Sequence, residues 1–342
     1  MYRALYRKWR PQRFEDVVAQ RGIVTALRNQ IATGRVGHAY LFTGVRGTGK
    51  TTCAKIFAKA VNCLHPQNGD PCGECEICRG IDNGSILDVV EMDAASNNGV
   101  DQVRALRDEA IYAPANVKKR VYIVDEVHML STAAFNALLK ILEEPPAHLM
   151  FILATTELHK VPATILSRCQ RYSFKRILPK DIAQRLSYVA GQEHIDLTPD
   201  GAELLSRLAD GALRDGLSLL DQCAAAGGTV DSRAVLEVLG LAGNLQTAQL
   251  MRHILDRNAQ AALLLLNELY AGGKDVGAVL GELSTLTRDL LLRKTAPEGG
   301  AALLSGGFDS ATLDQLGKDV PSNRFLYLAS TLQKAAADLY YS

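Results

Sequence analysis

The sequence has almost no net charge and no long apolar run. Its 38 lysines and arginines nearly balance its 37 aspartates and glutamates, which gives a formal net charge of +1. Without a global positive field to attract nucleic acid, any DNA contact must use a local patch or backbone amides. No apolar stretch is long enough to span a membrane, and residues 1–10 lack the apolar core of a signal peptide. We therefore expect a cytoplasmic protein that makes no membrane contact.

Five short apolar runs in the first half of the chain predict the strands of a sheet. Segments with a helical pattern separate them, which is typical of a parallel sheet with helices on both faces. The predicted fold class is therefore α/β. The runs occupy residues 40–42, 87–92, 121–124, 149–154 and 171–174.

The strand pattern ends near Pro179, and segments of helical length rich in alanine and leucine follow. Because 342 residues are too many for one core, we predict an α/β domain at 1–177, a small all-α domain at 178–240 and a second all-α domain at 241–342. Residues 295–307 are predicted to form a long loop. The chain ends at Ser342 in a helical pattern, so we expect a truncated form of a longer protein.

A glycine-rich segment after the first apolar run fits the phosphate-binding pattern G-x-x-x-x-G-K-[ST] in full. Glycines allow the backbone N–H groups to converge on phosphate oxygens, and the start of the next helix adds a favourable dipole. Lys50 supplies charge to the β- and γ-phosphates of ATP, and the Thr51 hydroxyl reaches Mg²⁺. The alternative is a glycine-rich turn with a solvated lysine. The predicted nucleotide-binding residues here are Gly44, Val45, Arg46, Gly47, Thr48, Gly49, Lys50, Thr51 and Thr52.

Two carboxylates, Asp125 and Glu126, follow the third apolar run. Ligands of an open α/β sheet lie at the carboxyl ends of its strands, which places both acids near the phosphate loop. Asp125 suits magnesium or its water, and Glu126 can orient and polarise an attacking water. The alternative is a strand that ends at two solvated acids. Thr155 and Thr156 end the fourth run, where a hydroxyl could bind the γ-phosphate or the water, whereas His128 alone better fits a structural role.

Four of the seven cysteines lie close together, with the spacing Cys-x8-Cys-x2-Cys-x2-Cys. Cytoplasmic proteins rarely contain structural disulfides, and four thiolates at short spacing favour tetrahedral zinc. An iron–sulfur cluster is the main alternative, followed by thiols that bind nothing. The segment resembles an insertion at about 63–80, where zinc would stabilise a module too small for its own core. The predicted ligands are Cys63, Cys72, Cys75 and Cys78, and the predicted buried apolar cysteines are Cys53, Cys169 and Cys223.

These motifs, in this order, resemble the AAA+ ATPase family and, within it, the clamp-loader branch. Ser167-Arg168-Cys169 is the signature tripeptide of that branch, and residues 139–146 are similar to its helix after the acidic pair. Residues 7–11 and 17–20 resemble its adenine-pocket segment, although Ala19 stands where glycine is common. With the four-cysteine insertion, the resemblance narrows to the gamma/tau family of bacterial DNA polymerase III subunits. It is dense over residues 1–240 and weaker beyond.

The resemblance implies a five-stranded AAA+ core, a helical lid and a helical collar that joins other clamp-loader subunits in a mixed pentamer. It implies that Arg168 reaches the ATP of a neighbouring subunit, that Arg214 senses the γ-phosphate, and that Thr155 belongs to the first sensor. Without it, Arg168 is read as a surface arginine paired with an acid, and Arg214 as a helix-start arginine paired with Asp215. Further implied positions are Arg10, Pro11, Val17 and Val18 around the adenine, and Arg104 and Lys140 at the DNA backbone.

The predicted function is that of the ATPase motor subunit of the DNA polymerase III clamp loader, with ATP, Mg²⁺ and Zn²⁺ as cofactors. ATP closes a pentamer that holds the sliding clamp open, and hydrolysis on primed DNA releases the clamp during DNA replication. A helicase or translocase would usually need a continuous basic channel or pore loops, and none is evident. A non-catalytic zinc scaffold conflicts with the intact phosphate loop and acidic pair. The sequence shows no polymerase catalytic triad, so any synthesis belongs to partners.

Overall fold

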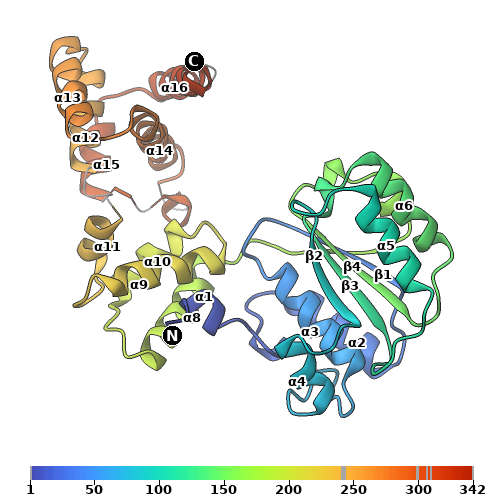
Figure 1. The fold of residues 1–342 in the computed structure, drawn as a ribbon. Helices are drawn as coiled ribbons and strands as arrows, with labels where there is room; N and C mark the ends of the chain where they lie inside the picture. Colours follow the sequence, from blue (N-terminus) through green and yellow to red (C-terminus); the bar gives the residue numbers. More distant parts are fainter. Residues whose placement is uncertain (1, 240–243, 298–299, 306, 309, 341–342) are drawn as a thin grey trace. The chain divides into compact units, whose positions relative to one another are not determined.

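The computed structural model of the chain describes residues 2–239, 244–297, 300–305, 307–308 and 310–340 (Figure 1). The chain forms two compact units, of which the first contains residues 1–189 and 209–221 and the second contains residues 190–208 and 222–342. The predicted small all-α domain contributes segments to both units. The domain limits at 177 and 240 therefore stay predictions, and residue 240 itself lies outside the described residues.

The first unit contains a five-stranded sheet in the order β2-β3-β4-β1-β5. Every neighbouring pair of strands is parallel. All five predicted strands are present, and their ends differ from the predicted ends by no more than two residues. The strands are β1 (Ala39–Thr43), β2 (Val89–Asp93), β3 (Arg120–Asp125), β4 (Leu149–Thr155) and β5 (Gln170–Ser173).

Helices cover both faces of this sheet. Figure 1 shows α5 (Val100–Ala110) and α6 (Thr132–Glu143) on one face, and α2 (Arg21–Ala32) and α3 (Lys50–Asn62) on the other. A separate hydrophobic core fills the space between the sheet and each helical layer. The arrangement confirms the prediction of a parallel sheet enclosed by helices.

The central strand β4 contributes to both cores. Phe151 and Leu153 belong to the core on the side of α5 and α6, whereas Ile152 and Ala154 belong to the core on the side of α2 and α3. Because both faces of the strand are covered, every position needs an apolar side chain. This is why the strand appears in the sequence as an unbroken apolar run.

The other elements of the first unit lie around the sheet, and the helix that follows the strands begins at Pro179, where the strand pattern was predicted to end. They are α1 (Leu5–Lys8), η1 (Phe14–Asp16), α4 (Glu76–Asn83), η2 (Val127–Met129), η3 (Leu158–Lys160), α7 (Ala163–Leu166), most of α8 (Pro179–Gln192) and most of α10 (Leu213–Ala225).

The second unit is helical, apart from an isolated bridge between Leu197 and Val230 in its described residues. Its main core forms around residues of α12, α14 and α16, among them Met251, Leu286 and Phe325. The helices are α9 (Pro199–Leu208), α11 (Ser232–Val238), α12 (Asn244–Leu255), α13 (Ala259–Ala271), α14 (Val276–Thr295), η5 (Gly300–Leu303), α15 (Ser310–Gly317) and α16 (Ser322–Tyr340). No helix in the described residues is both long and apolar enough to cross a membrane.

The predicted long loop at 295–307 is partly wrong, because its described part includes the 3-10 helix η5. The buried carboxylate of Asp289 in α14 accepts hydrogen bonds from the backbone N–H and the hydroxyl of Ser305. The N–H of Gly300 also donates to the carbonyl oxygen of Ala296 at 2.8 Å. These bonds fix the segment against the end of α14, which glycine and alanine content alone does not reveal.

Candidate nucleotide site and cysteine cluster

Polar residues gather where four neighbouring strands end. Thr43 at the end of β1 pairs in register with Thr155 at the end of β4, and Asp93 of β2 pairs with Asp125 of β3. Because the strands are parallel, their carboxyl ends meet at one edge of the sheet. The phosphate loop follows Thr43, and Glu126 follows Asp125. The structure thus brings the phosphate loop, the acidic pair and Thr155 to the same edge.

The phosphate loop uses glycine where a side chain does not fit. Gly44, Gly47 and Gly49 have φ angles of +141°, +78° and +104°, which L side chains rarely adopt. A Cβ atom at Gly44 would lie 2.4 Å from the carbonyl oxygen of Phe174, and one at Gly47 would lie 2.8 Å from Cβ of Ala212. Gly49 is the N-cap of α3. The N–H groups of the first turn of α3, which have no partner within the helix, therefore lie at the end of the loop, where they can bind a phosphate.

Lys50 folds back over the loop that precedes it. Its ammonium group donates to the carbonyl oxygen of Gly44 at 2.8 Å and to that of Val45 at 3.0 Å. Burial lowers the pKa of Lys50, and the carboxylates of Glu126 and Asp125 act in the opposite direction. The cation therefore lies close enough to the acidic pair for their charges to interact.

The two predicted magnesium ligands are in direct contact. The Thr51 hydroxyl donates to Oδ2 of Asp125 at 2.6 Å, and the backbone N–H of Glu126 donates to Oδ1 at 3.0 Å. Hydroxyl and carboxylate oxygens are the ligands that magnesium takes in nucleotide sites. Glu126 has a φ of 47°, a left-handed conformation that is uncommon for residues with a side chain and is found preferentially at functional sites.

The end of β4 holds the carboxylate of Glu126. Oε2 accepts hydrogen bonds from the backbone N–H of Thr156 at 3.2 Å and from its hydroxyl at 2.9 Å. Nδ1 of His128 lies 3.4 Å from the same oxygen and 3.0 Å from the hydroxyl of the buried Thr155. Nε2 of His128 lies 3.3 Å from the Glu157 carboxylate. The predicted water-orienting residue and the predicted first sensor therefore share one network, which the sequence did not predict.

A hollow of about 720 Å³ lies beside the phosphate loop, within the usual range for small-molecule sites. At its edge, Nε of Arg10 donates to the Thr52 hydroxyl at 3.2 Å, and burial lowers the pKa of Arg10. Tyr6 and Glu91 also line the hollow, although the sequence did not predict them. The predicted residues that line it are Arg10, Pro11, Val17, Val18, Arg46, Gly47, Thr48, Gly49, Lys50, Thr51, Thr52, Asp125, Glu126 and Arg214.

Ala19 is in a left-handed conformation, with a φ of 62°. The next residue fixes this turn, because the side-chain amide of Gln20 donates to the carbonyl oxygen of Lys175 at 2.8 Å and accepts from its N–H at 3.2 Å. Glycine adopts positive φ without steric cost. The geometry explains why glycine suits the position where this chain has alanine.

Arg214, at the start of α10, contacts an aromatic ring. Its Cζ lies 4.9 Å from the centroid of the Tyr6 ring. Among the described residues, it forms no ion pair with the adjacent Asp215, which was the alternative interpretation. A Cβ built on Gly47 would lie 3.5 Å from Cβ of Arg214. The Cβ atom of this arginine is therefore next to the phosphate loop.

Arg168 is not among the described residues that line the hollow. It follows α7, and its guanidinium pairs with Glu143 at the end of α6 at 2.6 Å and donates to the carbonyl oxygen of Thr164 at 2.8 Å. This ion pair is the contact expected from the simpler interpretation of Arg168. Its proposed action on a neighbouring subunit stays a prediction.

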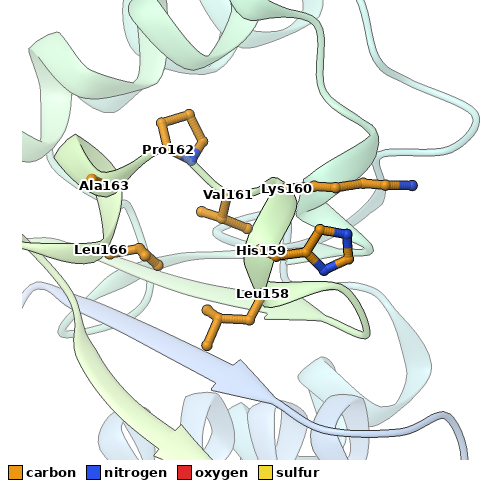
Figure 2. Close-up of a pocket in the computed structure, with 7 residues that line it drawn as sticks. All are labelled: Leu158, His159, Lys160, Val161, Pro162, Ala163 and Leu166. Atoms are coloured by element: carbon orange, nitrogen blue, oxygen red, sulfur yellow. The ribbon is translucent and has the colours of Figure 1, made fainter.

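A second hollow, of about 710 Å³, lies on the segment that leads from β4 to Arg168. In the view of Figure 2, Ala163 and Leu166 lie at the left, Pro162 lies above them, and the side chains of His159 and Lys160 extend to the right. This surface is mainly apolar. It begins at Leu158, directly after Glu157 of the network around Glu126.

The two predicted DNA-contacting residues lie on one helical layer. Arg104 belongs to α5 and Lys140 to α6, and these helices pack against each other. Both side chains are exposed, and Arg104 forms an ion pair with Asp101 at 3.3 Å. Both side chains are therefore accessible to a polyanion, and contact with DNA stays a prediction.

The four predicted metal-binding cysteines converge. Their Sγ atoms all lie within 4.8 Å of one another, with Cys63 and Cys72 3.5 Å apart and Cys72 and Cys78 3.9 Å apart. Four sulfurs at about 2.3 Å from a tetrahedral zinc ion would lie about 3.8 Å apart. The cluster, completed by Cys75, therefore has the donors and the size of a zinc site.

Backbone N–H groups donate to these sulfurs. The N–H groups of Cys72, Cys75 and Cys78 donate to Sγ of Cys63, Cys72 and Cys75 at 3.3, 3.4 and 3.4 Å. Burial raises the pKa of Cys72, but hydrogen bonds with the N–H groups of Cys75 and Glu74 and with the thiols of Cys63 and Cys75 together lower this pKa to about 6. Burial raises the pKa of Cys63 and Cys78. The backbone is therefore arranged to stabilise thiolate charge.

The remaining cysteines are outside this cluster. Cys53 and Cys223 are buried, as predicted, and burial raises the pKa of both thiols. Cys169 is only partly buried against the core under α5 and α6. The prediction of a buried residue holds only in part there, because Cys169 lies at the edge of that core, directly after the exposed Arg168.

Three family profiles match successive parts of the chain. The profile of the DNA polymerase III delta subunit matches residues 19–177. The ATPase lid domain of the DNA polymerase III clamp loader subunit matches residues 181–229, and domain III of the DNA polymerase III subunits gamma and tau matches residues 230–342. The DNA polymerase III subunit gamma of Buchnera aphidicola subsp. Acyrthosiphon pisum is 41% identical over 283 residues, which cover 82% of this chain and 78% of that protein. The chain belongs to the gamma/tau family of DNA polymerase III subunits.

Members of the gamma/tau family from other bacteria match the chain almost from end to end. The tau subunit of Bacillus subtilis is 47% identical over 342 residues, and that of Escherichia coli is 42% identical over 341 residues. These alignments cover 100% and 99% of this chain, but 61% and 51% of the tau subunits. The chain thus spans between half and two thirds of the length of these tau subunits. The family resemblance predicted from the motifs is confirmed.

A solved structure is similar in fold to this gamma/tau family member. The RuvB Holliday junction branch migration motor of Thermotoga maritima matches it with a TM-score of 0.52 at 15% identity, over 78% of this chain and 86% of that protein. At this identity the likeness concerns the fold alone. It confirms the predicted fold class, an AAA+ core with a parallel five-stranded sheet followed by all-helical regions.

Proposed function

We propose that the chain is the ATP-hydrolysing motor subunit of a DNA polymerase III clamp loader. The observation that carries the proposal is the meeting, at one edge of the sheet, of the phosphate loop, the Thr51–Asp125 contact and Glu126. Membership of the gamma/tau family supports the same conclusion. The similarity to a branch migration motor does not favour translocation, because it extends only to the fold.

Each residue of the site has a separate role in phosphoryl transfer. The loop N–H groups and Lys50 hold the β- and γ-phosphates. Lys50 now donates to neutral carbonyl oxygens, and charged phosphate oxygens form stronger bonds with an ammonium group. Thr51 and Asp125 would hold magnesium, which neutralises charge on the β- and γ-oxygens. Glu126 accepts a proton of the attacking water and orients it.

Arg168 acts in trans in this proposal. Its ion pair with Glu143 is partly exposed, with 33% and 51% of the two side chains accessible. Exposed pairs of this kind contribute about 0.2–1 kcal/mol, so a neighbour's γ-phosphate can displace the carboxylate. Arg214 and Thr155 contact the γ-phosphate from within the subunit, and Arg10, Pro11, Val17 and Val18 surround the adenine.

The partners follow from this role. The chain joins other clamp-loader subunits in a pentamer through its collar, and ATP stabilises the form that holds the sliding clamp open. Arg104 and Lys140 contact the backbone of primed DNA, and hydrolysis then releases the clamp. The net charge is only +1, because acidic residues balance the basic ones. This agrees with few phosphate contacts per subunit and a modest salt dependence for each. The protein works in the cytoplasm without membrane contact.

Zinc stabilises the insertion in this proposal. The donors would be the thiolates of Cys63, Cys72, Cys75 and Cys78, and the N–H···S bonds around them favour the charged form. A Cys₄ set with no open position fits a structural site rather than a catalytic one. The insertion is also tied to the rest of the unit, because Asp70 accepts from the N–H of Phe14 at 2.6 Å.

The test is ATP hydrolysis by a clamp-loader complex rebuilt with this chain. We expect turnover to rise when both the sliding clamp and primed DNA are added, and to be lost with Lys50→Ala. Hydrolysis that drives strand separation and ignores the clamp would indicate a helicase or translocase instead. Assembly without any hydrolysis would indicate a non-catalytic scaffold.

A further inference from the structure

The Arg214 side chain contacts Tyr6, and Arg7 and Arg214 at the Tyr6 hydroxyl lower its pKa. Cζ of Arg214 lies 4.9 Å from the ring centroid, within the distance at which a guanidinium is attracted to an aromatic face. The hydroxyl of the same ring accepts from Nε of Arg7 at 3.1 Å. Tyr6 is partly buried, whereas Arg214 is exposed.

The segment that carries Tyr6 is attached to the helix that carries Arg214. Asp221 of α10 accepts from the backbone N–H of Leu5 at 3.2 Å and from the Tyr2 hydroxyl. Leu5 is buried, with 4% of its surface exposed. Residues 214 and 221 are two turns apart, so they lie on the same face of α10. The short helix α1 therefore follows this face, and the position of the ring is set relative to α10 itself.

Ring and arginine are both beside the phosphate loop. A Cβ built on Gly47 would lie 3.5 Å from Cβ of Arg214, and Tyr6 and Arg214 line the same hollow as Lys50 and Thr51. A ligand whose phosphates bind the loop would meet the guanidinium where the ring holds it. Arg214 does not need to cross the site to reach that ligand.

An aromatic partner has a consequence that a carboxylate partner does not. A carboxylate neutralises a guanidinium and occupies its N–H donors, as Glu143 does for Arg168. A ring attracts the face of the guanidinium without neutralising it, so the N–H donors that do not meet the Tyr6 hydroxyl stay available, together with the full charge. The ring can therefore fix the plane of the cation before an anion arrives, which reduces the entropy lost on binding.

We infer that Tyr6 is a positioning residue for Arg214, and that the ring presents the guanidinium to the γ-phosphate of bound ATP. The inference rests on the proposed function and adds a residue to it. It assigns Tyr6 a role in distinguishing ATP from ADP, because only ATP has the phosphate that Arg214 contacts. It also makes the N-terminal helix α1 part of the nucleotide response, although α1 is far in sequence from both the phosphate loop and α10.

The test compares the dissociation constants of ATPγS and ADP by calorimetry. Tyr6→Leu keeps apolar bulk and removes the ring face. A cation–π contact at an exposed site corresponds to a change of about two- to fivefold in affinity. We expect Tyr6→Leu to lower the affinity for ATPγS by about that factor and to leave the affinity for ADP unchanged. Tyr6→Phe, which retains the face, should keep the wild-type preference, and Tyr6→Leu should have no further effect in an Arg214→Ala background.

Tyr188→Leu is the matched control. The guanidinium of Arg185 lies 5.2 Å from the Tyr188 ring, and neither residue is among the described residues that line the hollow. The Tyr188 ring also meets the edge of Trp9, which lines the hollow, at 5.8 Å between ring centroids. Any change in affinity from Tyr188→Leu should therefore be the same for ATPγS and ADP, and the ratio of the two affinities should stay at the wild-type value. If Tyr6→Leu lowers the affinities for ATPγS and ADP equally, the ring contacts the nucleoside. If Tyr6→Leu still lowers the affinity for ATPγS in the Arg214→Ala background, Tyr6 does not act through Arg214. Either result overturns the inference, as does tighter ATPγS binding or no change. Failure of the wild-type chain to bind ATPγS would instead overturn the proposed function.

Discussion

Replacing Arg168 should separate catalysis from stability more sharply than any other change in this chain. In the structure the guanidinium pairs with Glu143 at 2.6 Å, and 33% and 51% of the two side chains are exposed. Such a pair contributes about 0.2–1 kcal/mol to folding. At this size of protein, that corresponds to a fall of about 2–4 °C in Tm at most. An arginine that a neighbouring subunit supplies to the transferred phosphoryl group accelerates phosphoryl transfer by about 10³- to 10⁵-fold.

Arg168→Ala should therefore fold, assemble and bind ATP. Its rate of ATP hydrolysis in the presence of clamp and primed DNA should be at least about 10³-fold lower than that of the wild type. The assay is steady-state turnover of the rebuilt complex, with Tm and ATP affinity measured on the same preparation. Glu143→Gln is the matched control. It removes the same ion pair and keeps the arginine, so its stimulated rate should equal or exceed that of the wild type.

A mixing experiment tests whether Arg168 acts between subunits. Glu126→Gln subunits retain Arg168, and Arg168→Ala subunits retain a complete site of their own. Complexes assembled from both variants contain some interfaces with two working halves, so their turnover should exceed that of either variant alone. Normal stimulated turnover by Arg168→Ala, or no recovery in mixtures that assemble, would refute the reasoning.

The remaining predictions concern single residues of the first unit. Lys50→Ala should abolish ATP binding measured by calorimetry, whereas Glu126→Gln should bind ATP and retain it unhydrolysed. Thr156→Val removes a charge-assisted hydrogen bond from the Glu126 carboxylate, and we expect unstimulated hydrolysis to rise by about tenfold as the carboxylate is freed; an unchanged rate would contradict this. The purified protein should contain one zinc per chain by elemental analysis, and Cys75→Ser should lose it and unfold the insertion while ATP binding survives; iron, or no metal under reducing conditions, would contradict this. Ala19→Gly relieves a left-handed alanine, so thermal unfolding should show a gain of about 1 kcal/mol.

The fold of the first unit could be predicted because its three inner strands, β3, β4 and β1, are buried on both faces, whereas the edge strands β2 and β5 are partly exposed. A strand such as β4 must then be apolar at every position, and the sequence marks it clearly. The phosphate loop and the cysteine cluster could be predicted for a related reason. Their chemistry depends on residues that are close in the chain, so spacing alone identifies them.

The contacts that control the site could not be predicted, because they join residues far apart in the chain. Glu126 and Thr156 are 30 residues apart, and they meet only because β3 and β4 are neighbours in the sheet. The Tyr6–Arg214 contact joins the first helix to α10, and no local pattern marks an aromatic residue as a partner for a distant arginine. The 3-10 helix after α14 depends likewise on the distant carboxylate of Asp289.

The central claim is that ATP bound at this phosphate loop controls the grip of the complex on a sliding clamp. The most direct test is the affinity of the rebuilt complex for a fluorescently labelled clamp, measured with ATPγS, with ADP and without nucleotide. The account predicts tight clamp binding with ATPγS alone, and loss of that binding when the Lys50→Ala chain replaces the wild type. Clamp affinity that is the same under all three conditions, or that survives Lys50→Ala, would contradict it.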